Sequence, residues 1–112
     1  MKIFRKLIRD RISDIIAADG GKAVTRVLDE AEYRSALENK LLEEVQEMRQ
    51  APLPGAGGQG AHKAEEIADI YEVLDAIIVA NGFSASDIQV LKAKKRAERG
   101  GFEKRLFLES VE

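Results

Sequence analysis

Two short acidic clusters, separated by a stretch rich in glycine and proline, constrain the fold of this chain more than any other feature. Each cluster carries two carboxylates three residues apart, namely Glu44 with Glu47 and Glu66 with Asp69. On a helix this spacing places both side chains of a pair on one face, one turn apart. The fold therefore depends on whether these faces are turned to solvent or toward other helices.

A helical projection places both clusters at apolar stripes. At about 100° per residue, Glu44 falls within about 20° of Leu37, inside the first stripe, and Glu47 lies at its edge. On the second helix Glu66 falls among apolar side chains, and Asp69 lies just past them. The stripes consist of Tyr33, Leu37, Leu41, Val45 and Met48, and of Ile67, Ile70, Tyr71, Val73, Leu74, Ile77 and Ile78. The sequence thus predicts two helices that direct carboxylates toward a core.

Gathered carboxylates need a counter-charge, because buried charge is costly unless it is paired or binds a metal. A divalent cation satisfies this need, and ligation by oxygen alone suits Mg²⁺ or Mn²⁺ rather than zinc. The alternative is that the glutamates lie on solvated faces and pair with Lys40, Lys63 or Arg49. Two pairs that both intrude on apolar stripes favour the metal.

Composition narrows the class of protein. A length of 112 residues predicts one domain over residues 1–112. The net charge of −2 gives no case for nucleic-acid binding, and no apolar run is long enough for a signal peptide or a membrane span. The chain has no cysteine, which removes disulfides and thiolate chemistry and fits a cytoplasmic location.

The periodicity predicts a mainly α fold, a bundle of about four helices. Asp29 and Glu32 form a capping-box pattern at the start of the second helix, and Ser84 or Ser86 caps the fourth. The expected helices cover residues 10–18, 29–50, 62–80 and 84–99. The second half of the third helix is apolar on nearly all sides, which predicts a subunit interface.

Three further stretches remain. Residues 22–28 and 102–109 read as strands and could pair as a small two-stranded sheet. Residues 51–60 read as a helix-to-helix connection. A phosphate-binding loop is rejected there, because the stretch lacks the Gly-Lys-Ser/Thr ending and a preceding strand. His62, the only histidine, is expected at the surface near a helix start.

Basic residues gather at both ends of the chain. Lys6 and Arg9 lie in the N-terminal stretch, and Lys95 and Arg99 lie in the last predicted helix. Such clusters suit an anionic ligand such as a polyphosphate. The alternatives are a solvated basic face at the N-terminus and favourable charge at a helix C-terminus.

Together these motifs resemble the all-α nucleoside triphosphate pyrophosphohydrolases, and within them the MazG-related, phosphoribosyl-ATP pyrophosphohydrolase-like house-cleaning group. The resemblance covers most of the chain. It is carried by Lys6-Leu7-Ile8-Arg9-Asp10-Arg11-Ile12, by Glu44-x-x-Glu47 and Glu66-x-x-Asp69, and by Lys95 through Arg99-Gly100-Gly101-Phe102.

The resemblance implies a helical homodimer or homotetramer that uses Mg²⁺ to cut a nucleoside triphosphate between its α and β phosphates. The implied metal ligands are Glu44, Glu47, Glu66 and Asp69. The implied phosphate contacts are Lys95, Arg99, Lys6 and Arg9. A carboxylate that the metal does not fully occupy, Glu47 or Glu43, could accept the proton of the attacking water.

Two other functions remain open. One is phosphoribosyl-ATP hydrolysis in histidine synthesis, which the same acidic motif would serve. The N-terminal motif resembles the house-cleaning group more closely. The other is a non-enzymatic helical dimerisation module, in which the acidic clusters only keep the protein soluble.

Overall fold

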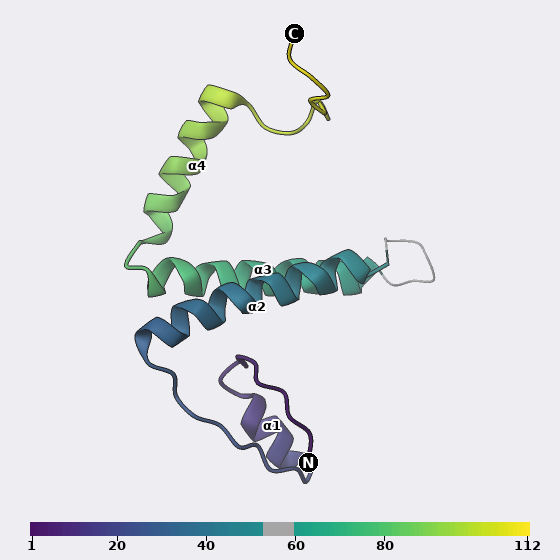
Figure 1. Cartoon of the computed structure of the whole chain (residues 1–112), viewed down its shortest axis with the longest axis vertical. Coiled ribbons are helices and arrows are strands. Elements are labelled where there is room, and N and C mark those ends of the chain that lie inside the picture. The colour runs from purple at the N-terminus through teal and green to yellow at the C-terminus, as the bar shows by residue number, and fades with distance from the viewer. Residues whose placement is uncertain (53–59) are drawn as a thin grey trace.

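The computed structural model describes residues 1–52 and 60–112. In these ranges the chain forms four helices and no strand (Figure 1). The prediction of a mainly α fold is confirmed, and so are the four expected helices, with bounds that differ by at most two residues. The helices are α1 (Ile12–Ala18), α2 (Glu30–Gln50), α3 (Gly60–Ala80) and α4 (Ala85–Arg99).

Capping boxes fix the starts of α2 and α4. The backbone N–H of Glu32 donates to the Asp29 carboxylate at 2.8 Å, and the Asp29 N–H donates back to Glu32. The backbone N–H of Asp87 likewise donates to Ser84 Oγ at 3.1 Å, so Ser84 and not Ser86 is the cap. Each cap satisfies N–H groups that have no partner within the helix.

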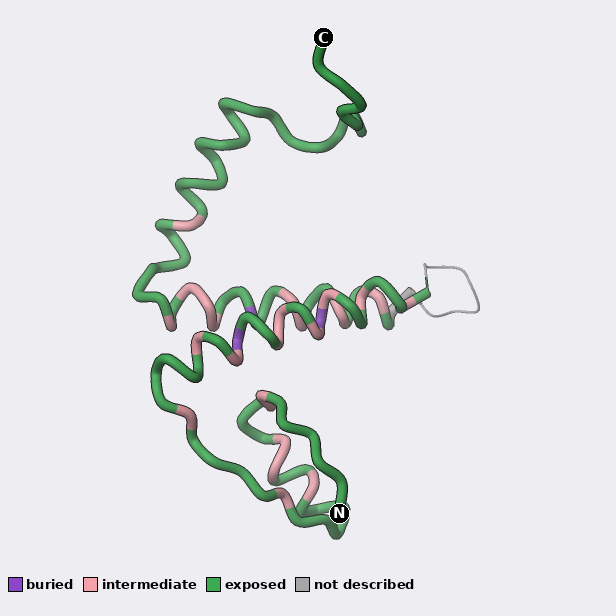
Figure 2. Tube along the Cα trace, in the orientation of Figure 1, coloured by how far each residue is buried: buried purple, intermediate pink, exposed green. Residues whose placement is uncertain are grey.

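The packed part of the molecule is the antiparallel pair of α2 and α3 (Figure 1). Among the described residues its buried apolar side chains are Leu37, 3% exposed, and Val73, 9% exposed. Lys63 Nζ, near the start of α3, donates to the backbone carbonyl of Ala51 at 3.1 Å, just past the end of α2. Figure 2 shows that the buried positions lie on these two helices.

The chain bends by 110° between α3 and α4, which directs α4 away from the packed pair. Its apolar residues Val90 and Leu91 are exposed, and only Ile88 is half-buried. The radius of gyration is 18.3 Å, whereas a compact chain of this length has about 13 Å. This arrangement therefore leaves the apolar side of α4 and much of the second half of α3 in solvent (Figure 2).

The predicted two-stranded sheet is wrong. Residues 22–28 and 102–109 are irregular, and Figure 1 places them at opposite ends of the molecule. Their β-branched and aromatic side chains, including Val24, Val27 and Phe107, are exposed. A two-stranded ladder without a helix or a third strand to cover its apolar face is only marginally stable. The β-propensity of these segments therefore has no packing to support it.

The predicted connection at residues 51–60 lies mostly outside the described residues. Of the described helices, none taken singly is long and apolar enough to cross a membrane. The pair from His62–Ala80 to Ala85–Arg99, bent by 110°, meets that test in length and composition only.

Candidate metal centre

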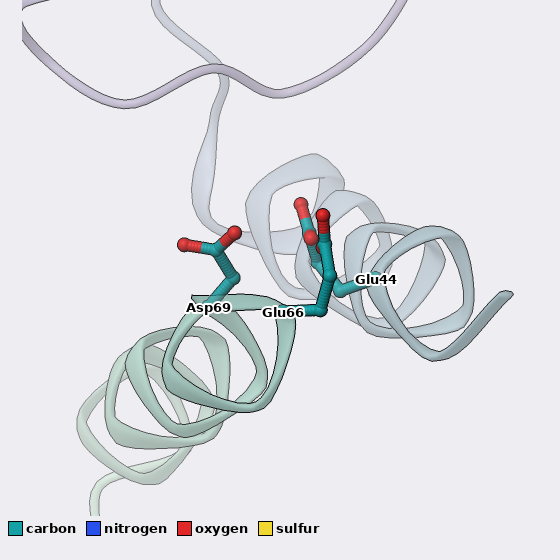
Figure 3. A group of neighbouring side chains, drawn as sticks. All are labelled: Glu44, Glu66 and Asp69. Atoms are coloured by element: carbon teal, nitrogen blue, oxygen red, sulfur yellow. The ribbon is translucent and has the colours of Figure 1, made fainter. Parts of the chain in front are cut away.

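Three carboxylates meet where α2 and α3 pack together. Glu44 comes from α2, and Glu66 and Asp69 come from successive turns of α3 (Figure 3). One oxygen from each lies within 4.8 Å of the other two. The antiparallel packing brings residues 22 positions apart in the sequence into one group, and the i, i+3 spacing turns Glu66 and Asp69 to the same side of α3.

Two of these carboxylates each have a buried oxygen without a hydrogen-bond partner. Glu44 is 7% exposed, which confirms that it lies inside the apolar stripe of its helix. Its Oε1 lies 3.5 Å from Lys40 Nζ, but its Oε2 and the Oε2 of Glu66 are buried without a hydrogen-bond partner. Buried polar atoms without partners are rare in folded proteins. The donor set, oxygen atoms alone with excess negative charge, fits a hard divalent cation.

The pKa values reflect this crowding. Burial, followed by the neighbouring Glu47 carboxylate, raises the pKa of Glu44 to about 7, and Lys40 offsets only part of this increase. Burial, followed by the influence of Glu47, also raises the pKa of Glu66. Both shifts have the same cause, because desolvation and nearby negative charge disfavour the ionised form. Near neutral pH the group must therefore hold protons or a cation.

These shifts make the metal-free protein less stable as the pH rises. The folded state binds more protons than the unfolded chain between the ordinary Glu44 pKa of 4.5 and its folded value of about 7. The free energy of unfolding therefore falls across this window, by about 1 kcal/mol or more. We expect the Tm in chelator to be about 4 °C or more lower at pH 8 than at pH 5.

Thermal unfolding followed by circular dichroism checks this pH dependence. The Glu44→Gln variant lacks the titrating group and serves as the control, so its Tm should vary much less over the same range. A wild-type Tm that rises from pH 5 to pH 8 in chelator would contradict the expected sign.

The N-terminal segment brings two predicted basic residues to this region. Arg9 Nη2 donates to Asp69 Oδ1 at 2.7 Å, and Lys6 Nζ lies 3.7 Å from Glu43 Oε1. Lys40 Nζ also reaches Glu43 Oε1, at 3.3 Å. The alternative pairing of the acidic clusters with lysine is thus realised at Lys40, while Lys63 bonds a backbone carbonyl instead.

Glu47 lies beside the group of three rather than within it. Its side chain is exposed and lines a hollow of about 290 Å³. The hollow is lined by Glu47, Gln50, Ala51, Pro52, His62 and Glu66. His62 is exposed, as expected, but its place at this hollow was not predicted from the sequence. The signal was its position four residues before Glu66, which puts both on one face of α3.

The structure does not bring Lys95 and Arg99 to the carboxylates. Both residues are exposed on α4, which packs only against α3 among the described helices. Figure 1 shows α4 rising away from the pair that carries the site. Among the described residues, the basic side chains that form ion pairs with carboxylates of this region are Lys6, Arg9 and Lys40.

No family model matches the chain, and no solved structure matches it. It is 44% identical over 63 residues to an uncharacterized protein of Mycolicibacterium smegmatis, a match that covers 54% of this chain and 64% of that protein. The chain thus spans slightly less than two thirds of the length of that relative.

Proposed function

We propose that this protein is a Mg²⁺-dependent nucleoside triphosphate pyrophosphohydrolase. It would cleave the bond between the α and β phosphates, release a nucleoside monophosphate and pyrophosphate, and clear non-standard nucleotides from the cytoplasmic pool. The observation that carries this proposal is the group of Glu44, Glu66 and Asp69, whose oxygens lie within 4.8 Å of one another. The motif resemblance described above supports the choice of reaction.

The residues fit a hard cation, because buried carboxylate oxygens of Glu44 and Glu66 have no protein partner. Glu44, Glu66 and Asp69 would hold the cation, with Glu47 beside them. When bound, Mg²⁺ or Mn²⁺ supplies neutralisation of phosphate charge and Lewis-acid polarisation of phosphoryl oxygens. Without such a cation, the same carboxylates would repel a triphosphate.

Glu47 is the better candidate for the general base. Its exposed carboxylate lines the hollow beside Glu66, where a water and the substrate have access. Glu43 already interacts with Lys40 at 3.3 Å and with Lys6 at 3.7 Å. In the proposed reaction a water molecule attacks the α-phosphorus and its proton passes to Glu47. The bond from the α-phosphorus to the oxygen that bridges the α and β phosphates breaks, and pyrophosphate leaves with that oxygen.

The test is a panel of standard and modified nucleoside triphosphates, with phosphoribosyl-ATP, incubated with Mg²⁺ or with chelator. We expect pyrophosphate, and not single phosphate, to be released in Mg²⁺ only. The preferred substrate distinguishes house-cleaning from a role in histidine synthesis. Release that persists in chelator, or no release from any substrate, would contradict the proposal.

A second copy of this chain is the proposed partner. Burying the exposed apolar side of α4, including Val90 and Leu91, would remove apolar surface from water. The basic end of α4 and the acidic region of α2 and α3 lie on the same chain, but the 110° turn before α4 separates them. In a dimer with a two-fold axis, the basic end of α4 in each copy can contact the acidic region of α2 and α3 in the other copy.

We therefore expect light scattering after gel filtration to give two or four times the chain mass of 12.4 kDa. Leu91→Glu should shift this mass toward that of one chain, because it places a charge in the proposed interface. Gln89→Glu is the control and should leave the mass unchanged, because it places the same charge about 160° away from Leu91 on the other side of α4. A wild-type protein that stays at 12.4 kDa at high concentration would exclude the self-association.

A further inference from the structure

The N-terminal segment holds one of the carboxylates of the site with a cation of its own. Arg9 and Asp69 are 60 positions apart, yet Arg9 Nη2 donates to Asp69 Oδ1 at 2.7 Å. Asp69 is one of the three residues whose oxygens group within 4.8 Å. The guanidinium thus neutralises part of the charge that a divalent cation would otherwise neutralise.

We propose that Arg9 is a displaceable counter-ion of the metal centre. It pairs with Asp69 in the metal-free protein, is driven off when a divalent cation binds, and is then free to contact the phosphates of the substrate. This inference rests on the proposed function and adds an exchange between a protein cation and the metal. The N-terminal segment is then the part of the chain that changes its contacts when a cation binds to the carboxylates.

The surroundings of Arg9 and Lys40 explain why Arg9 is the cation that moves. The side chain of Arg9 is 58% exposed and belongs to an irregular segment. The side chain of Lys40 is 16% exposed and is fixed one turn before Glu44 on α2. A divalent cation would repel both Arg9 and Lys40, but Arg9 can move away from Asp69 without disturbing a helix.

The strength of the pair also suits an exchange. An ion pair between exposed side chains shifts an equilibrium by at most about fivefold. A divalent cation that interacts with several carboxylates outcompetes such a pair. Once released, the planar guanidinium can donate two parallel hydrogen bonds to a phosphate, which a lysine cannot do.

The segment keeps a second contact during the exchange. Lys6, three residues before Arg9, lies 3.7 Å from Glu43 on α2. Leu7 and Ile8 between them are half-buried. Release of Arg9 from α3 therefore leaves the segment attached to α2, so that Arg9 stays near the site and reaches a bound polyphosphate.

The test compares Mg²⁺ dissociation constants, measured by isothermal titration calorimetry without nucleotide, for the wild type, Arg9→Ala and Arg9→Lys. We expect Arg9→Ala to bind Mg²⁺ about three- to tenfold more tightly, because both the competing pair and the repulsion are removed. Arg9→Lys keeps the charge and should stay within about twofold of the wild type. The KM for the nucleotide should rise in both variants, because neither has the guanidinium.

Arg11→Ala is the matched control, since it removes the same charge from the chain two positions away. It should bind Mg²⁺ within about twofold of the wild type. Equal or weaker Mg²⁺ binding by Arg9→Ala would overturn this inference and leave the proposed function intact. No Mg²⁺ binding by the wild type and Arg9→Ala would overturn the metal centre itself, and the exchange with it.

Discussion

Replacement of Glu66 by Gln is expected to lower Mg²⁺-dependent pyrophosphate release by about 100-fold or more. Loss of a residue that only orients a metal ligand costs about 10- to 100-fold in metal affinity or activity, so loss of a ligand itself should cost at least as much. Gln has nearly the same shape as Glu but lacks the negative charge, and the buried Oε2 of Glu66 has no protein partner to lose. The fold should therefore remain intact.

Initial rates of pyrophosphate release, together with circular dichroism of the same samples, measure both parts of this expectation. Glu65→Gln is the matched control, because Glu65 is the adjacent residue on α3 and is exposed. Its rate should stay within about twofold of the wild type, in line with other surface substitutions. If Glu66→Gln released pyrophosphate at the wild-type rate in Mg²⁺, Glu66 would be excluded as a metal ligand.

Magnesium is expected to raise the Tm of the wild-type protein by about 10 °C at a concentration of 100 times its Kd. Binding to the folded state alone contributes about 2.7 kcal/mol at that concentration. In a chain of about 100 residues, each kcal/mol corresponds to about 4 °C or more. The gain should be larger at pH 8 than at pH 6, because burial raises the pKa of Glu44 to about 7 and the ion binds the ionised carboxylate.

Glu44→Gln should lose most of this metal response. Its Tm without metal should equal or exceed that of the wild type, because a buried and under-compensated charge has been removed. Sodium chloride at matched ionic strength controls for general screening by salt. If Mg²⁺ gives no more stabilisation than sodium chloride, the non-enzymatic dimerisation module becomes the better description.

The parts of the structure that local sequence controls were predictable. The capping box of Asp29 and Glu32 involves residues three positions apart, and its prediction was confirmed. The burial of Glu44 followed from the phase of one helix against its own apolar stripe, and it was confirmed as well. Local periodicity therefore predicted the four helices and the burial of Glu44.

The parts that depend on distant contacts were not predictable. Residues 22–28 have strand-like composition, but no partner in the described chain covers them. The proximity of Arg9 to Asp69 joins residues 60 positions apart, and the spacing of either residue alone does not reveal it. The direction of α4 likewise depends on the turn at Asn81 and Gly82, where Gly82 has a φ of 80°.

The hydrogen bond from Lys63 to Ala51 ties the start of α3 to the end of α2, at one end of the packed pair whose longitudinal register places the carboxylates. One helical turn advances about 5.4 Å, and one residue rotates a side chain by about 100°. A slip of α3 by a single turn would thus exceed the 4.8 Å within which the carboxylate oxygens of Glu44, Glu66 and Asp69 gather. One residue inserted between Asp69 and Val73 would rotate both α3 carboxylates by about 100° relative to the buried side chain of Val73 and turn them away from Glu44.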